Sequence, residues 1–116
     1  MTLILHITTR SQWQAAQREG VYRADSLETE GFIHCSTPTQ VVSTANAYYH
    51  GQSGLVLLCI ESDHVQSEIR YERAHGELFP HLYGALNLDA VTQAIDFEPN
   101  AAGSFTLPTV LITEET

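Results

Sequence analysis

The sequence contains no lysine, and its five arginines stand against fourteen acidic residues, which gives a formal net charge of -9. So acidic a chain is repelled by the phosphate backbones of nucleic acids and by anionic membrane surfaces. We therefore expect neither a nucleic-acid partner nor a membrane partner.

Long apolar runs are also missing. No segment reaches the roughly 18 consecutive apolar residues of a membrane-spanning helix. The first residues, MTLILHITTR, lack the basic and small-residue parts of a signal peptide. We expect a soluble, cytoplasmic protein. Its 116 residues, 43% of them hydrophobic, predict a single domain over residues 1–116, with a core over about 3–98 and a peripheral acidic tail over 99–116.

Cysteine is scarce. Cys35 and Cys59 lie in apolar runs and form no CxxC pair, so neither a disulfide framework nor a cysteine zinc site is indicated. We expect two reduced thiols, with Cys59 in the core. For Cys35 a buried apolar role is favoured, while a reactive thiol near a helix N-terminus stays an alternative.

Hydrophobic patterning predicts the strands. Apolar and polar residues alternate over 3–8, 32–36 and 68–74, and every residue of 55–60 is apolar, as in a central strand covered on both faces. A last short strand is expected over 95–98. Pro80 and Gly84 favour an ordered loop over 75–86, and 89–94 reads as a short helical stretch.

Two helix starts are marked. Thr9 and Gln12 have the spacing of a capping box, and Gly20 marks the end of that helix. The polar segment 21–30 after it is expected to be a loop. A second helix is expected with Thr37 as N-cap and Pro38 at its first position. The order of elements predicts a small α+β domain with a curved or split mixed β-sheet and two main helices.

Histidine supplies much of the candidate chemistry. His6 shares a strand face with Thr8, and His34 shares one with Ser36. This repeated pairing suggests a shared cleft, and the helix start after His34 would favour an anionic ligand. The alternative is structural: His6 is a hydrogen-bonded core residue, and Ser36 or Thr37 only caps the helix.

Further candidates lie later in the chain. Glu72 lies on the polar face of an expected strand and could stabilise a developing cation, or could be a solvated surface carboxylate. The segment FPHLYG offers rings for stacking on a flat ligand, or else plugs the core; these are Phe79, His81 and Tyr83. The remaining histidines are expected at the surface: His50, His64 and His75.

Together these segments resemble the small proteins of domain-of-unknown-function family 952, over about residues 3–98. The motifs that carry the resemblance are LHITT with Trp13 and Gly20, SLETEGFIHCST with Gln40, LVLLCIE, IRYE and ELFPHLYGAL. The resemblance implies an ADP-ribosyltransferase-like fold, a split and strongly curved β structure that binds NAD between two small sheets.

The resemblance also implies roles for the candidate residues. His6 would bind NAD, and His34 or Ser36 would lie near the nicotinamide or the ribose. Glu72 would stabilise the cationic ribose that forms when nicotinamide leaves, and the rings of FPHLYG could stack on nicotinamide. The chain departs from the family of transferases in having no arginine on its first strand and no paired acidic motif.

Three functional hypotheses remain open. The first is an NAD-using ADP-ribosyltransferase-like enzyme or NAD glycohydrolase. The second is a non-catalytic module that binds a nucleotide or small anion in the same cleft. The third is a zinc site formed by His6, His34 and His81, which no HxH or HExxH spacing supports, so we expect no metal.

Overall fold

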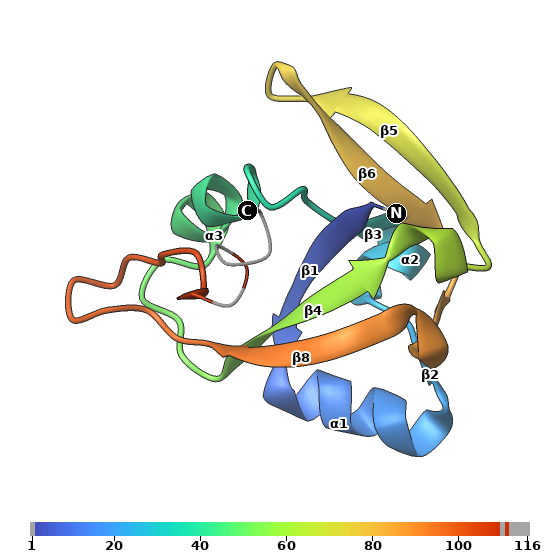
Figure 1. The fold of residues 1–116 in the computed structure, drawn as a ribbon, viewed down its shortest axis with the longest axis horizontal. Helices are drawn as coiled ribbons and strands as arrows, with labels where there is room; N and C mark the ends of the chain where they lie inside the picture. Colours follow the sequence, from blue (N-terminus) through green and yellow to red (C-terminus); the bar gives the residue numbers. More distant parts are fainter. Residues whose placement is uncertain (1, 110, 112–116) are drawn as a thin grey trace.

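The computed structural model describes residues 2–109 and 111, which form a compact α+β domain built on small antiparallel sheets (Figure 1). The first sheet has the order β1-β4-β8, and the second has the order β3-β6-β5. A third pairing joins β2 to β7. The strands are β1 (Leu3–Thr9), β2 (Val21–Tyr22), β3 (Ile33–His34), β4 (Leu55–Glu61), β5 (Glu68–Ala74), β6 (Glu77–Tyr83), β7 (Leu86–Asn87) and β8 (Val91–Phe97).

The predicted split sheet is confirmed, but the mixed pairing is wrong. All strand pairings among the described residues are antiparallel. The two larger sheets meet at one bridge, where Leu5 N–H donates to Ser36 O (2.7 Å) and Ser36 N–H donates to Leu5 O (2.8 Å). Since β1 and β3 are edge strands of their sheets, this bridge ties the sheets together along those edges.

The helix α1 (Arg10–Glu19) forms as its capping signals predict. Gln12 N–H donates to Thr9 Oγ1 (3.1 Å), and Gly20 ends the helix in the left-handed conformation with φ 86°. This αL position is one that glycine adopts without strain.

The second predicted helix starts later than expected. α3 spans Val41–Tyr48, and residues 38–40 form a turn before it. The N-cap is Gln40 and not the predicted Thr37, whose hydroxyl bonds to Thr39 Oγ1 (3.1 Å) and to no helix N–H. Thr37 contributes through its backbone, because its N–H donates to Gln40 Oε1 (3.0 Å) and its carbonyl accepts from Val41 N–H (3.1 Å). A further short helix, α2 (Asp25–Thr29), occupies a segment that polarity alone marked as a loop.

The predicted loop over 75–86 is wrong, since most of it is the strand β6 at the centre of the second sheet. Pro80 lies opposite Cys35, just beyond the last ladder pair of β3 and β6, which is His34 with His81. Cys35 N–H donates to the Pro80 carbonyl (3.0 Å), and this is the hydrogen bond that proline can still make there. The N–H and C=O of one residue in an antiparallel strand point to the same neighbour, so the N–H that proline lacks would have faced Cys35. The missing donor explains why β3 stops at His34.

The predicted helical stretch over 89–94 is also shifted. The structure has a 3-10 helix, η2 (Leu88–Ala90), and β8 already begins at Val91. Another 3-10 turn, η1 (Ser62–His64), links β4 to β5.

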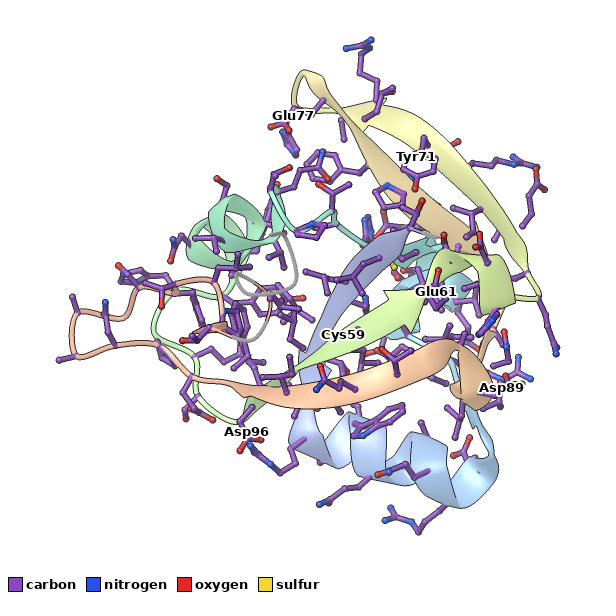
Figure 2. The ribbon with its side chains drawn as sticks, viewed as in Figure 1. Cys59, Glu61, Tyr71, Glu77, Asp89 and Asp96 are labelled. Atoms are coloured by element: carbon purple, nitrogen blue, oxygen red, sulfur yellow. The ribbon has the colours of Figure 1, made fainter. Side chains whose placement is uncertain are left out.

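The core lies on both faces of the first sheet, as the uniformly apolar β4 predicts. Leu55, Leu57 and Cys59 pack on one face, and Val56 and Leu58 pack on the other. Figure 2 shows Cys59 on this central strand. Cys35 is buried as well, and burial raises the pKa of its thiol, which supports the core interpretation over the reactive one.

The tail predicted to be peripheral contributes to the core where it is described. Phe105 and Leu111 are buried, and the Phe105 ring stacks on Phe97 with ring centroids 4.8 Å apart. Composition alone hid this, because Phe105 stands among polar residues and the segment as a whole ends in acidic and threonine residues. The remainder of that tail, residues 110 and 112–116, lies outside the described residues. No helix in the described part of the chain has the length and apolar character needed to cross a membrane.

Candidate functional site

An open cleft of about 980 Å³ lies beside the junction of the two main sheets. Its walls come from β1, β3, β5 and β6, with contributions from α2 and α3. The cleft brings together most of the predicted site residues: His6, His34, Ser36, Glu72, Phe79, His81 and Tyr83. Neither Thr8 nor Thr37 is among the described residues that line it.

His6 is buried, and both of its ring nitrogens have partners inside the protein. Nδ1 lies 2.5 Å from His34 O, and Nε2 lies 2.8 Å from the Tyr22 hydroxyl. A carbonyl oxygen can only accept, so Nδ1 carries the proton of the neutral ring and Nε2 accepts from Tyr22. His6 thus ties β1 to the backbone of β3 and to β2.

Burial also sets the protonation of this pair. Desolvation lowers the pKa of His6 to about 4, which outweighs the opposing effect of its bond to His34 O. Burial likewise raises the pKa of Tyr22 to about 12. Both groups are neutral at pH 7. The Tyr22 hydroxyl shares its single proton between His6 Nε2 and Thr8 Oγ1 (3.0 Å), because the Thr8 hydroxyl itself donates to Gln12 Oε1 (2.9 Å).

Glu72 lies at the wall of the cleft with its carboxylate fixed from two sides. His81 Nδ1–H and the Tyr83 hydroxyl donate to the same oxygen, Oε1, at 2.8 and 2.6 Å. These bonds, that of Tyr83 first, lower the pKa of Glu72 below its ordinary value. Oε2 has no hydrogen-bond partner among the described residues, and 37% of the side chain is exposed. The site therefore offers an oriented, ionised carboxylate with one free oxygen.

The strand register brings these groups together. Glu72 on β5 faces Phe79 on β6, and His81 is one step along the same face of β6. His81 also pairs directly with His34 on β3. The second sheet therefore places a carboxylate and two imidazoles on neighbouring strands.

Phe32 lies against both imidazoles. Its ring stacks on His81 with centroids 4.1 Å apart at 19°, and it meets the edge of His34 at 4.7 Å and 66°. His34 Nε2 donates to Glu30 Oε2 (3.1 Å). Its side chain is 52% exposed, against 8% for His81.

Arg70 completes the rim of this site. Its guanidinium lies 4.3 Å from the centroid of the Tyr83 ring and pairs with Glu68 through Nε (3.0 Å). The Arg70 guanidinium therefore interacts with both the Tyr83 ring and the Glu68 carboxylate. Tyr71 lies between Arg70 and Glu72 in sequence and projects from β5 into solvent (Figure 2).

The hydroxyl candidates have structural partners. Thr8 Oγ1 donates to Gln12 Oε1 (2.9 Å), and Ser36 Oγ donates weakly to Thr44 Oγ1 (3.5 Å). Thr37 serves the turn before α3 and does not reach the cleft. Of these three, Ser36 alone remains on the wall of the cleft.

The three surface histidines are exposed as predicted. His75, however, also lines the cleft, and Tyr48 on α3 donates its hydroxyl to His75 Nε2 (2.8 Å). This contact spans from α3 to the turn between β5 and β6. Glu77 lies beside the same turn, at the end of the hairpin that faces α3 (Figure 2), and accepts from Gln40 Nε2 (3.2 Å).

The described residues contain no group of three or more His, Cys, Asp and Glu side chains arranged to hold a metal ion. For the triad of His6, His34 and His81 the reason is local. The lone pair of His6 Nε2 already accepts from Tyr22.

Three contributors to the site were not predicted: Tyr22, Glu30 and Phe32. Phe32 had a usable signal, because strand alternation places it on the face of His34. Glu30 and Tyr22 had none, since both lie in the polar segment 21–30 that was expected to be a loop. Tyr22 meets His6 only through the tertiary fold, and Glu30 meets His34, four residues later, through the local turn after α2.

Three solved structures of similar fold are of one protein, CC0527 from Caulobacter crescentus. The crystal structure of protein CC0527 from Caulobacter crescentus matches with a TM-score of 0.88 and 34% identity, covering 96% of this chain and 99% of that chain. The crystal structure of its double mutant gives the same values. The solution NMR structure of CC0527 matches with a TM-score of 0.80 and 36% identity over 92% and 94% of the two chains.

Among curated proteins, none matches the sequence. A family model described as a protein of unknown function (DUF952) matches residues 7–94, which is most of the chain and includes the side chains discussed at the cleft except His6. On this evidence the chain belongs to the DUF952 family.

Proposed function

We propose that this protein is an NAD-binding enzyme of the ADP-ribosyltransferase type, acting as a transferase or as an NAD glycohydrolase. The observation that carries the proposal is the Glu72 carboxylate, held through Oε1 by His81 and Tyr83 and free at Oε2. Loss of nicotinamide leaves a cationic ribose. A preoriented carboxylate that needs no reorganisation stabilises such a cation well.

The lining of the cleft suits the nicotinamide end of the substrate. Three acidic residues, Asp25, Glu30 and Glu72, line it against one arginine, Arg73. This excess of acidic residues favours the positively charged nicotinamide ring of NAD over its negatively charged diphosphate. Phe79 and Tyr83 offer ring surfaces for stacking, and the volume lies within the range of about 300 to 1,000 Å³ typical of ligand sites.

The fold supports the same proposal. Two small antiparallel sheets that meet at one bridge and open into a cleft agree with the split β structure of ADP-ribosyltransferases. In this proposal His6 is a positioning residue, because both of its nitrogens are used to hold β2 and β3.

An NMR titration with NAD tests binding, and chromatography of released nicotinamide tests catalysis. We expect amide shifts in residues 6–8, 34–40 and 79–84. Nicotinamide release should fall by about 100-fold or more in Glu72→Gln. Glu28→Gln is the control, since Glu28 is exposed on α2 and is not among the residues that line the cleft.

Two other outcomes are informative. NAD binding with no nicotinamide release, unchanged in Glu72→Gln, would instead support a non-catalytic binding module. If saturating NAD and nicotinamide riboside shift no amide at the cleft, the proposal is wrong.

A further inference from the structure

We infer that His34 and His81 form an acid–base pair that extends the reaction to uncharged N-nucleosides, with His81 as general base and His34 as general acid. The inference rests on the proposed function, because it uses Glu72 to stabilise the ribosyl cation. It adds the substrate class and two proton-transfer roles.

The geometry of the pair is the first support. His34 and His81 are direct cross-strand partners on β3 and β6, and their ring centroids are 5.4 Å apart at 79°. The Phe32 ring contacts both of them. The rings are therefore fixed side by side on the wall of the cleft.

Each imidazole is oriented by its own carboxylate. Glu72 accepts from His81 Nδ1 (2.8 Å), and Glu30 accepts from His34 Nε2 (3.1 Å). His81 Nε2 and His34 Nδ1 make no hydrogen bond among the described residues. A carboxylate that fixes one nitrogen sets the tautomer and leaves the other nitrogen for proton transfer.

The order of the strands aims the free nitrogen of His81. β6 lies between β3 and β5, so Glu72 and His34 are on opposite sides of His81. The two nitrogens of an imidazole point in diverging directions. With Nδ1 directed to Glu72, Nε2 is directed toward the side of His34.

The two rings differ in their access to water. The side chain of His81 is 8% exposed and that of His34 is 52% exposed. A sheltered ring suits the base, and a ring in contact with solvent can regain a proton after each turnover. The exposures therefore assign the base to His81 and the acid to His34.

The proton balance is complete without a further reactant. The bond from C1′ to the heterocycle nitrogen breaks, and His34 Nδ1 gives its proton to the departing nitrogen. Water forms the new C1′–O bond and loses its proton to His81 Nε2. Solvent then returns both histidines to their starting states, and the net reaction adds water across the C1′–N bond.

The leaving group defines the substrate class. Nicotinamide leaves a riboside as a neutral molecule and needs no proton, whereas a purine leaves as an anion unless it is protonated. A site that served only pyridinium ribosides would have no use for a general acid. An uncharged nucleoside carries no phosphate, so neither the chain's net charge of -9 nor the acidic lining of the cleft repels it.

The test compares inosine, an uncharged nucleoside, with nicotinamide riboside, in wild type and in His34→Gln. We expect wild type to cleave both. His34→Gln should lower kcat/KM for inosine by about 100-fold or more, and for nicotinamide riboside, whose leaving group needs no proton, by a factor at least about 30-fold smaller. The control is His64→Gln, an exposed histidine outside the cleft that should change neither.

The pH profile provides a second readout that a structural role would not reproduce. Inosine cleavage by wild type should give a bell-shaped profile, and His34→Gln should lose the alkaline limb. His81→Gln should slow both substrates, and circular dichroism checks that this buried variant folds.

The outcomes separate the two proposals. Equal loss on both substrates in His34→Gln, no loss on either, or no inosine cleavage by wild type overturns the acid–base pair, while nicotinamide release still supports the proposed function. Cleavage of neither substrate overturns both.

Discussion

At the scale of single residues, His6 shows how a polar side chain can be buried at the centre of the fold. Its neutral tautomer satisfies the His34 carbonyl through Nδ1 and the Tyr22 hydroxyl through Nε2. Protonation would put a hydrogen on Nε2 and a charge in a buried site. The hydrogen bonds of His6 and its lowered pKa are therefore consistent with each other, because the buried site favours the neutral ring over the charged one.

This residue predicts a loss of stability in acid. The pKa of His6 is about 4 in the folded state and about 6.5 when unfolded, so between these values the unfolded chain binds more protons. Stability should fall as the pH drops through this window, by about 3 kcal/mol at most. Urea unfolding at pH 7 and pH 4.5 measures the fall.

The substitution His6→Asn isolates the contribution of His6 to the pH dependence of stability. The variant should be less stable at pH 7 but should lose less stability on acidification than wild type. Carboxylates titrate in both proteins and cancel in the comparison. Parallel pH dependences in the two proteins would show that His6 does not titrate as described.

Tyr83 predicts a shift in the titration of Glu72. Its hydroxyl is the largest cause of the lowered pKa of that carboxyl. Tyr83→Phe should raise the pKa of Glu72 toward its ordinary value, so that the carboxylate is lost at a higher pH as the solution is acidified. Carbon-detected NMR of the Glu72 carboxyl gives the pKa directly, and Tyr71→Phe, on the opposite face of β5, should leave it unchanged.

At the scale of secondary-structure elements, local signals decided what could be predicted. The Thr9 cap, the Gly20 stop and the apolar β4 are all encoded by neighbours in sequence, and each was predicted correctly. β6 was not, because the only local sign, Pro80, argues against a strand. Whether Pro80 fits in this strand depends on where β3 ends, and that is determined by the tertiary structure.

The same distinction applies to the candidate site. Alternation placed His34 and Phe32 on one face and Cys35 on the other, and the structure agrees in burying Cys35 and exposing His34. Alternation could not reveal that Tyr22 and Glu30 would meet the two histidines. Those contacts require β2 and α2, whose short sequences carry almost no periodic signal.

The cap of α1 predicts a measurable loss. Thr9→Ala removes the acceptor for Gln12 N–H and should lower the free energy of unfolding by about 1 kcal/mol. Thr9→Ser keeps the hydroxyl and should retain most of the stability. Urea unfolding of the three proteins measures this, and equal stability of the Ala and Ser variants would contradict the capping role.

At the scale of the whole molecule, the part of the core on the Leu55, Leu57 and Cys59 face of the first sheet joins distant parts of the chain. Val41 and Ala45 of α3, Leu57 of β4 and Phe105 from beyond β8 pack on the same face of the first sheet. Asn46 reinforces this, because its Oδ1 accepts from Phe105 N–H (2.7 Å). The segment after β8 is therefore part of the folded unit.

Removing the ring of Phe105 tests that conclusion. Phe105→Ala should lower the free energy of unfolding by about 3 to 5 kcal/mol, the usual cost of this substitution in a core. Thr106→Ala, at an exposed neighbouring position, should change it by less than about 0.5 kcal/mol. Thermal or urea unfolding gives both values. Similar stabilities of the Phe105→Ala and Thr106→Ala variants would show that this segment is not part of the core.

The pairing of β1 has a consequence for how the chain folds during synthesis. Its ladder partner is β4, so none of its sheet hydrogen bonds to Leu55–Glu61 can form until α1, α2 and α3 have left the ribosome. At about 5 to 20 residues per second, the first strand waits for seconds with its apolar side chains unpaired. Before β4 emerges, β1 can bond to Tyr22 through the side chains of His6 and Thr8 and to Ser36 through the single backbone bridge from Leu5. A nascent chain stopped soon after that bridge should therefore be a good chaperone substrate, and one extended past β4 a poor one.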